Sequence, residues 1–226
     1  MQNLTLKTPV HTTLREAIAD SLREAILQGL LKAGEKISEP ELAAKFGISR
    51  TPIREAFRQL DSEGFLKVIP RRGARVAPLT EKDVVEFYDV KAVLEGYAAR
   101  LACTRLTDRD LERMSQLNTQ MAQADGSKEY KQVFRWHMDF HSVFLKACGN
   151  EHLYELIQML VSKFQRFRML LALAGKSERS IQQHKQIIDA FRRKDVVLAE
   201  KLVIENAMTG KEMIVGEIFK EMKGVI

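Results

Sequence analysis

The sequence is short of cysteine and has no long apolar run, and each shortage excludes a class of protein. It contains two cysteines, Cys103 and Cys148, which lie far apart. They fit buried free thiols in a reducing compartment and predict no disulfide. No segment approaches the roughly 18 to 20 apolar residues that would cross a bilayer. The first residues lack the basic-then-apolar pattern of a signal peptide, so we expect a cytoplasmic protein with no membrane partner.

Acidic residues are outnumbered, and the basic excess is uneven along the chain. The net charge is +6. Residues 1–78 contain 13 basic and 9 acidic side chains, a net of +4, whereas residues 79–226 contain 23 and 21, a net of +2. The excess is concentrated in the shorter part, as expected when that part meets a polyanion. We expect two domains, at 1–78 and 79–226, because the chain is long enough for two hydrophobic cores.

Residues 38–62 are predicted to form two short helices joined by a tight turn. Ser38 is a good N-cap, and Gly47 is the residue type that most often ends a helix in a left-handed conformation. Ser49 then caps a second helix, and Pro52 fits its first turn, where the missing N–H is not needed. The apolar residues of the second helix recur at helical spacing and predict one buried stripe: Ile53, Ala56, Phe57 and Leu60.

The polar residues of the second helix lie off this stripe, and they are mostly basic: Arg50, Thr51, Arg54 and Arg58. Two helices with a tight glycine turn, the second carrying arginines near its start, have the geometry that places a helix in the major groove of DNA. The alternative is a basic run that is only a solvated face.

The segment after the second helix predicts a two-stranded wing. Residues 65–69 and 74–77 are short β-prone runs, and residues 70–73 between them form a turn. Arg71 and Arg72 at its tip can enter a narrow minor groove or neutralise phosphates. Gly73 lets the backbone approach the sugar-phosphate edge. The helix pair, the basic second helix and the basic wing together favour sequence-specific binding to double-stranded DNA.

Residues 39–76 carry four motifs in order: Glu-x-x-Leu-Ala, Gly-Ile-Ser-Arg-Thr-Pro-Ile-Arg-Glu-Ala, Leu-x-x-Glu-Gly-Phe-Leu and Arg-Gly-x-Arg-Val. On these motifs the segment resembles the winged helix-turn-helix of the GntR family of bacterial transcription regulators. The resemblance implies that the arginines and the threonine at the start of the second helix contact bases or backbone. It also implies that operator preference differs here, because Pro40 stands where many relatives carry a basic DNA contact. The predicted DNA-binding residues are Ser49, Arg50, Thr51, Arg54, Arg58, Arg71, Arg72 and Gly73.

Beyond residue 78 the pattern is helical throughout. Thr80 caps a new helix, with Glu81 and Asp83 in its first turn, and no later stretch alternates as a strand does. Six helical segments are expected, at 80–104, 107–124, 127–148, 150–174, 177–194 and 195–222. The predicted fold class is mainly α, with an N-terminal winged helix-turn-helix and its small β wing, followed by an antiparallel bundle of six helices.

Polar residues of the bundle are placed to surround one cavity. His137 and His141 are four residues apart, so both project from one face of a helix at a metal-chelating spacing. His184 precedes the turn at 194–195 by about as many residues as Asn206 follows it. In an antiparallel hairpin these two residues lie at the same level and can face each other.

The bundle resembles the FCD ligand-binding domain of the FadR subgroup, in its shorter six-helix variety, on residues 88–95, 140–141, 147–150 and 180–195. Many members hold a divalent metal with an aspartate, a histidine four residues later and two further histidines. His141 and His184 match two of these histidines, whereas His137 replaces the aspartate and Asn206 replaces the last histidine. The resemblance implies a metal site at these four residues, and three imidazoles with an amide would suit zinc or nickel.

The same cavity could also work without a metal. A metal-free pocket would bind an organic acid through the same polar groups, and a site that has lost its ligand is a further alternative. Arg168 lies in a segment that resembles the family's arginine-bearing helix facing the pocket. Arg168 and Asn206 are therefore predicted to bind an effector that carries a carboxylate.

These features predict a transcriptional regulator, in family habit a repressor, and not an enzyme. A homodimer would bind an inverted repeat through two winged domains, and a small molecule in the bundle would change its affinity for DNA. The competing class is a metalloenzyme fused to a DNA-binding domain, since three histidines with an open position could activate water. The sequence has no His-Glu-x-x-His motif, nucleophile elbow or phosphate-binding loop to support that class. An architectural DNA-binding protein without an effector would leave the buried polar residues without a role.

Overall fold

The computed structural model describes residues 13–70, 72–124, 129–174 and 178–221, and the chain divides into two compact units. The first comprises the chain up to Thr80 together with Ser162–Arg166. The second comprises Glu81–Val161 and Phe167–Glu221. The change from one unit to the other at Thr80 lies two residues beyond the division expected after residue 78.

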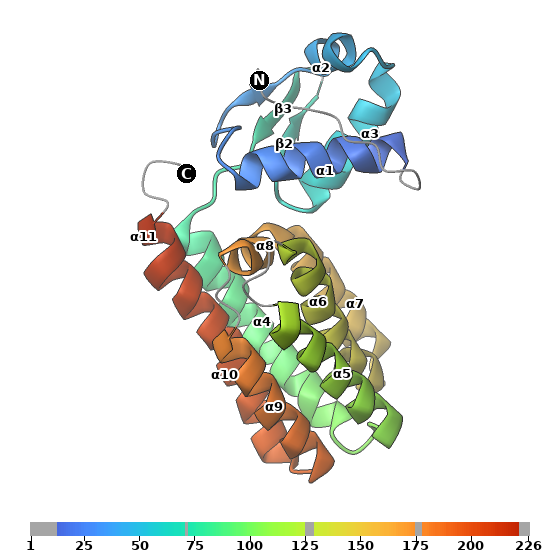
Figure 1. The fold of residues 1–226 in the computed structure, drawn as a ribbon, viewed down its shortest axis with the longest axis vertical. Coiled ribbons are helices and arrows are strands. Elements are labelled where there is room, and N and C mark those ends of the chain that lie inside the picture. The colour runs from blue at the N-terminus through green and yellow to red at the C-terminus, as the bar shows by residue number, and fades with distance from the viewer. Residues whose placement is uncertain (1–12, 71, 125–128, 175–177, 222–226) are drawn as a thin grey trace. The chain divides into compact units, whose positions relative to one another are not determined.

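The first unit combines three described helices with a small antiparallel sheet (Figure 1). Its elements are α1 (Leu14–Leu27), β1 (Lys36–Ile37), α2 (Glu39–Phe46), α3 (Arg50–Ser62), β2 (Leu66–Ile69) and β3 (Gly73–Val76). Strand β3 is central, and it pairs with β2 from Leu66↔Val76 to Ile69↔Gly73 and with β1 on its other edge. The predicted wing is present, and the two-residue β1, which the sequence pattern does not reveal, adds a third strand.

Capping residues explain where α2 and α3 begin and end. The Ser38 hydroxyl accepts a hydrogen bond from the Glu41 N–H at 3.5 Å, and Gly47 ends α2 with φ at 66°, in the left-handed conformation expected of it. Ser49 has the extended backbone of an N-cap residue, but its side chain makes no capping hydrogen bond. The predicted position of this cap is therefore right, and the predicted side-chain bond is wrong.

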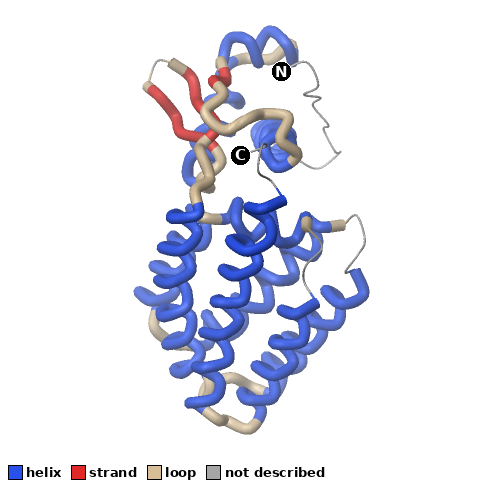
Figure 2. The backbone as a smooth tube through the Cα atoms, turned by 90° about the vertical axis from the view of Figure 1, so that its left-hand side faces the viewer, coloured by secondary structure: helices blue, strands red, loops and turns tan. Residues whose placement is uncertain are grey.

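The second unit is helical throughout its described residues, and the mainly α fold class is confirmed (Figure 2). Its elements are α4 (Glu81–Ala102), α5 (Asp108–Ala124), α6 (Tyr130–Ala147), α7 (Glu151–Lys163), α8 (Gln165–Leu173), α9 (Glu178–Arg192), α10 (Val196–Met213), a π-helical turn (Ile214–Ile218) and α11 (Phe219–Glu221). The end of α7 and the start of α8 are the Ser162–Arg166 segment that is grouped with the first unit. No helix in the described part of the chain is long and apolar enough to cross a membrane.

Two of the six predicted bundle segments are interrupted. The segment expected at 150–174 divides at Phe164 into α7 and α8, and the segment expected at 195–222 contains the π-helical turn. The division has a packing reason: α7 buries one narrow stripe of every fourth residue, whereas residues 166–170 are all buried. A straight continuation of α7 could not bury consecutive residues on all sides. The breaks predicted at 126–127 and 175–176 lie outside the described residues.

Helices α4 and α10 pack closely because glycines let their backbones approach. A Cβ atom at Gly96 of α4 would lie 2.6 Å from the Ile204 side chain, and one at Gly210 of α10 would lie 2.9 Å from the Tyr88 ring. Both distances are too short for a methyl group, so larger residues would push the helices apart. This pair forms one wall of the cavity in the bundle, and fully buried aromatic rings fill the core beside it: Phe140, Phe144 and Phe191.

Candidate functional site

One face of α3 packs into the first unit, and the other carries exposed basic residues. The predicted apolar stripe is buried, with Ile53, Ala56 and Leu60 at 0% exposure. This packing holds the opposite face toward solvent, and the polar residues predicted on it are all exposed: Arg50, Thr51, Arg54 and Arg58. The orientation of the basic residues therefore follows from the hydrophobic pattern of the same helix.

A hollow in the first unit joins the start of α3 to the wing. Its lining consists of Lys36, Ser38, Glu39, Pro40, Arg50, Arg54, Arg72 and Gly73. The structure thus brings together four predicted DNA-binding residues that lie up to 23 positions apart in the sequence. Four basic side chains against one acidic side chain make the hollow suited to a polyanion. Ser49, Thr51 and Arg58 are exposed but are not part of this lining, and Arg71 lies outside the described residues.

Glu39 is a functional candidate that the sequence pattern did not single out. Its carboxylate accepts a hydrogen bond from Arg54 Nη2 at 2.9 Å and lies near Arg54 Nε at 3.3 Å. The arginine side chain is 56% exposed and that of Glu39 is 17% exposed. A guanidinium held on one edge keeps its other N–H groups free for a partner. Glu39 therefore orients Arg54 beside Arg50 in the hollow.

The backbone at Gly73 requires glycine. Its φ is 87°, and a Cβ atom there would lie 2.5 Å from the Ile37 carbonyl oxygen. Both the left-handed conformation and the approach of β1 exclude a side chain. Glycine at position 73 therefore lets β3 lie close to β1 and leaves the end of the wing without a side chain at this residue.

Replacing Arg72 at the wing tip with alanine is expected to weaken binding to operator and to random DNA by a similar factor. The reason is that a wing arginine neutralises phosphate charge, and this contribution does not depend on sequence. The slope of log affinity against log salt should fall by about 1. Fluorescence anisotropy titrations between roughly 50 and 200 mM salt measure both quantities. A changed base preference with an unchanged salt slope would contradict this role.

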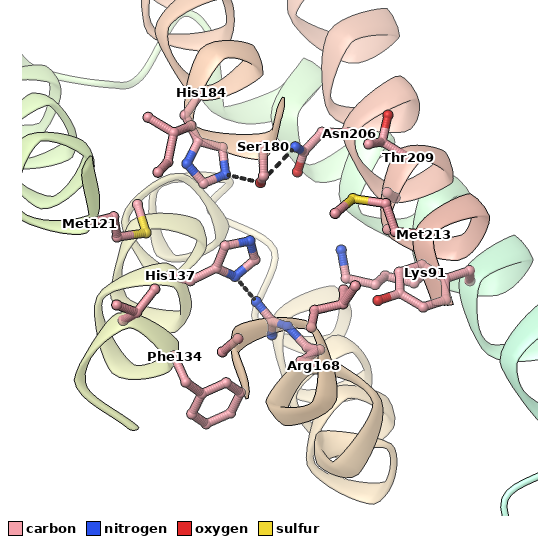
Figure 3. A pocket seen from close by; sticks show the side chains of 17 residues that line it. Lys91, Met121, Phe134, His137, Arg168, Ser180, His184, Asn206, Thr209 and Met213 are labelled. Carbon is pink, nitrogen blue, oxygen red and sulfur yellow. Dashed lines mark hydrogen bonds between the residues drawn. The ribbon is translucent and has the colours of Figure 1, made fainter. Parts of the chain in front are cut away.

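A cavity lies in the bundle between α4, α6, α8, α9 and α10, and Figure 3 shows the side chains that border it. The structure brings the predicted residues His137, Arg168, His184 and Asn206 into its lining, whereas His141 lies directly behind His137 on the same helix. The three imidazoles could each offer one nitrogen, with those atoms within 4.8 Å of one another. The rest of the lining is mostly apolar and includes Met121, Phe134, Leu171 and Met213.

His141 is wholly buried beside an ion pair that the sequence pattern did not predict. Its Nδ1 lies 3.2 Å from the carboxylate of Glu95, which is 0% exposed and pairs with Lys91 one turn away. Neither ring nitrogen of His141 has a hydrogen-bond partner of good geometry in the described structure, and Nδ1 interacts with Glu95 through its charge. Buried nitrogens normally have a partner, so the Nε2 atom is suited to bind a ligand or cation.

His184 is buried and anchored by an amide. Its Nδ1 lies 3.1 Å from the Asn118 side-chain oxygen, and Asn118 Nδ2 donates to the Ile181 carbonyl at 3.1 Å. The other ring nitrogen, Nε2, lies 3.3 Å from the Ser180 hydroxyl. The ring stacks on Phe140 at a centroid distance of 3.9 Å. Asn118 and Phe140 therefore fix the orientation of this ring.

His137 and Asn206 have different hydrogen-bond partners from His141 and His184. Arg168 Nη2 lies 2.7 Å from His137 Nδ1, as Figure 3 shows. Asn206 Nδ2 donates to Ser180 Oγ at 3.2 Å and to Gln183 Oε1 at 3.0 Å. The amide nitrogen of Asn206 is thus occupied, and only its oxygen could face a cation.

Burial dominates the protonation of these groups. It lowers the pKa of His141 to about 4, although Glu95 opposes the shift. Burial, together with Arg168, lowers the pKa of His137 well below the usual value, and burial, together with His141, does the same for His184. Burial alone would raise the pKa of the Glu95 carboxyl, but Lys91 and His141 reverse the effect and lower it. At neutral pH the three imidazoles are therefore uncharged, as metal ligands and hydrogen-bonding groups must be.

Two family models match the chain. Residues 14–76 match "Bacterial regulatory proteins, gntR family", and residues 86–206 match "FCD domain". A "Probable D-xylose utilization operon transcriptional repressor" of Paenarthrobacter nicotinovorans is 32% identical over 200 residues, which cover 87% of this chain and 86% of the relative. An "Uncharacterized HTH-type transcriptional regulator YdhC" of Bacillus subtilis is 31% identical, over 78% of this chain and 80% of the relative.

Solved structures agree on the fold. The structure of E. coli McbR/YncC aligns with a TM-score of 0.71 at 22% identity, over 92% of this chain and 99% of that one. A GntR family member from Pseudomonas syringae aligns with a TM-score of 0.53 at 26% identity, over 100% of this chain and 94% of that one. The chain belongs to the gntR family of bacterial regulatory proteins, with an FCD domain as its helical part, and is a DNA-binding transcriptional regulator and not an enzyme.

Proposed function

We propose that the protein is a repressor whose affinity for an inverted-repeat operator is set by a small carboxylate bound in the bundle cavity. Relatives named as operon repressors, including the D-xylose regulator, support the direction of control. The basic hollow of the first unit supports operator binding, and the exposed side chains of Ser49, Thr51 and Arg58 would add contacts. We expect the regulator to act in the cytoplasm, because its operator DNA is there.

The observation that carries the effector assignment is the environment of Arg168. This arginine is only 5% exposed, and its guanidinium contacts His137 Nδ1 and Met138 Sδ, both neutral. Lys91, the other buried cation at the cavity, is matched by Glu95. No carboxylate in the described part of the chain forms an ion pair with Arg168. Glu95 also acts on Arg168 and raises its pKa, but one carboxylate cannot neutralise two buried cations. The remaining buried positive charge is costly, so an anion that pairs with Arg168 relieves that cost.

The chemistry of the lining narrows the anion to a carboxylate with an apolar body. A planar guanidinium matches a carboxylate through two parallel hydrogen bonds. Around it, Phe134, Leu171 and Met213 present apolar surface, while Asn206 and Thr209 offer polar contacts on the opposite wall. Pockets of this kind use the apolar wall for affinity and a few polar groups for orientation.

A divalent cation, zinc or nickel, fits the histidine cluster. His141 Nε2 is a buried nitrogen without a partner, and His184 has its Nδ1 anchored, as metal-binding imidazoles usually have. His137 lies within reach of both, and Asn206 could add its oxygen. When bound, such a cation supplies an electrophilic centre for the oxygen atoms of a carboxylate.

Removing the metal is expected to lower thermal stability, because a ligand that binds only the folded state stabilises it by RT ln(1 + [L]/Kd). At zinc concentrations about 100 times Kd the difference is about 2.7 kcal/mol. His184→Ala should remove most of it, whereas His152→Ala, at an exposed histidine of α7, should not. Calorimetric unfolding of zinc-loaded and chelator-treated protein provides the comparison. Equal stability of both wild-type forms would count against a metal and favour the metal-free pocket.

A homodimer is expected to form through α4 and α7. Val90, Val93 and Tyr97 are 49%, 66% and 47% exposed and form one stripe along α4. Leu156 and Met159 of α7 are also exposed, at 46% and 65%. Tyr97 at one end of the α4 stripe shares a hollow with Glu151 and His152, the first residues of α7. An apolar stripe on a regulator of an inverted repeat fits a second copy of the chain, related by a twofold axis.

Val93→Asp is therefore expected to convert a dimer into a monomer, because it places a charge in the centre of a desolvated contact. Val197→Asp is the matched control: Val197 is 71% exposed but lies on α10, away from the stripe. Sedimentation velocity at micromolar concentration measures the mass of both variants. A dimer that survives Val93→Asp and dissociates with Val197→Asp would refute this interface.

The repressor proposal is tested by selecting operator DNA from a random library with the full-length protein. The selected sequence should contain an inverted repeat, and a panel of small carboxylates should include one that changes operator affinity. Arg168→Leu should bind the operator and no longer respond to that carboxylate. A protein that selects an operator but responds to none of the anions would leave the DNA assignment standing and remove the effector.

A further inference from the structure

The hydrogen bonds around the three cavity histidines decide which ring nitrogen of each carries the proton. Asn118 donates its amide N–H to the Ile181 carbonyl, so its oxygen faces His184 as an acceptor. His184 Nδ1 must then be the protonated nitrogen, which leaves the lone pair on Nε2. The carboxylate of Glu95, 3.2 Å from His141 Nδ1, favours the same tautomer in His141. The lone pair on His141 Nε2 has no partner, whereas that on His184 Nε2 accepts a hydrogen bond from the Ser180 hydroxyl, which a cation would have to displace.

His137 is in the opposite state. A guanidinium can only donate hydrogen bonds, so Arg168 Nη2, 2.7 Å away, makes His137 Nδ1 an acceptor. The proton of the neutral ring is then on Nε2. That nitrogen points away from Arg168, toward the side of the cavity that holds Ser180 and His184 (Figure 3). His137 therefore presents an N–H group to the cavity, where a metal ligand would present a lone pair.

We propose that His137 and Arg168 both bind the anionic effector, from opposite sides of the His137 ring, and that only His141 and His184 are imidazole ligands of the cation. The inference rests on the proposed function, because it takes the cavity as the effector site. Arg168 contributes the charge, and His137 contributes a second donor whose proton Arg168 itself fixes in place. His137 therefore donates a hydrogen bond to the anion and does not bind the cation.

If His137 binds the anion and not the cation, the cation and the carboxylate should bind cooperatively. Two imidazoles are a weak donor set for a divalent cation, and the described cavity offers Asn206 as a further neutral donor. A carboxylate held by His137 and Arg168 would supply the negative donor that these ligands lack. Cation and carboxylate should therefore strengthen each other's binding, by an equal factor in each direction.

The first arm of the test is calorimetric titration of zinc into chelator-treated, full-length protein without added anion. His141→Ala and His184→Ala should each lower zinc affinity at least tenfold. His137→Ala should change it by less than threefold, like the exposed control His152→Ala. His137→Asp should instead raise zinc affinity at least tenfold, because a carboxylate replaces an N–H donor. A loss in His137→Ala as large as that in His141→Ala would overturn the proposal.

The second arm uses acetate labelled with carbon-13 as the anion probe and follows its NMR signal. His137→Ala should weaken acetate binding about tenfold or more, since hydrogen bonds to charged groups contribute roughly 1.5–3 kcal/mol. His137→Asp should weaken it further, because its carboxylate would pair with Arg168 and repel the anion. Acetate binding that is unchanged in His137→Ala would overturn the anion role.

A third measurement needs no substitution. Nitrogen-15 NMR of the wild-type imidazoles distinguishes a protonated, an unprotonated and a metal-bound nitrogen. For His137 we expect an unprotonated Nδ1 and a protonated Nε2, both before and after zinc is added. A zinc-bound nitrogen in His137 would overturn the inference and leave the proposed function intact. Wild-type protein that binds neither zinc nor acetate would overturn both.

Discussion

Arg50→Ala and Arg54→Ala are each expected to abolish specific operator binding while the protein stays folded and dimeric. Both arginines lie in the first two turns of α3 and line the basic hollow beside the wing. A bidentate arginine contact with a base discriminates by about 1–3 kcal/mol, or roughly 5- to 150-fold. Neither side chain contributes to the core, because both are exposed. Stability should therefore change by less than about 0.5 kcal/mol.

The measurement is a fluorescence anisotropy titration with the selected operator and with a scrambled sequence. Arg15→Ala is the control, since Arg15 is an exposed arginine of the same unit that lies on α1, outside the hollow. The ratio of the two affinities should collapse for Arg50→Ala and Arg54→Ala and persist for Arg15→Ala. Unchanged ratios in the α3 variants would show that another surface reads the DNA.

Glu95→Ala is expected to lower the free energy of unfolding by about 3–5 kcal/mol, the largest stability change expected here. Glu95 is 0% exposed and Lys91 is 3% exposed, so the substitution leaves a buried ammonium without its counter-ion. Burial already lowers the pKa of Lys91, and only the carboxylate opposes that shift strongly. Urea unfolding of chelator-treated protein at neutral pH measures the loss.

The chain offers a matched control for this ion pair. Lys201 and Glu205 have the same spacing on α10, but their side chains are 69% and 48% exposed. Glu205→Ala should cost about 0.5 kcal/mol or less, because water already solvates both charges. The double variant Lys91→Met with Glu95→Leu should recover much of the stability lost in Glu95→Ala. Equal losses of unfolding free energy in Glu95→Ala and Glu205→Ala would show that burial does not increase the contribution of the Lys91–Glu95 pair to stability.

Local sequence patterns were enough to predict helix α3 and the wing formed by β2 and β3. The stripe of α3 and the glycine after α2 act within a few residues, so their effects are visible in the sequence and appear in the structure. The break between α7 and α8 was not predictable in the same way, because it depends on contacts with residues distant in sequence, such as those of Phe167 with Phe87 and of Arg168 with His137.

In the candidate site, too, local patterns predicted the histidines but not the residues that contact them. The spacing of His137 and His141 places both on one helix face, and the hairpin at 194–195 brings His184 and Asn206 into one cavity lining. Glu95 and Asn118 are on other helices, and no local pattern connects them with the imidazoles that they orient. These partners decide the tautomers, so the chemistry of each ring became clear only from tertiary contacts.

The bundle cavity and the operator-binding surface should be thermodynamically coupled, because the effector acts on DNA affinity from the cavity. The most direct test measures the Kd of the active carboxylate by calorimetry, on free protein and on protein saturated with operator DNA. For a repressor released by its effector, operator should weaken carboxylate binding by the same factor by which the carboxylate weakens operator binding, about 5- to 150-fold. Arg168→Leu should remove both effects. A carboxylate Kd that is the same with and without operator would contradict the account.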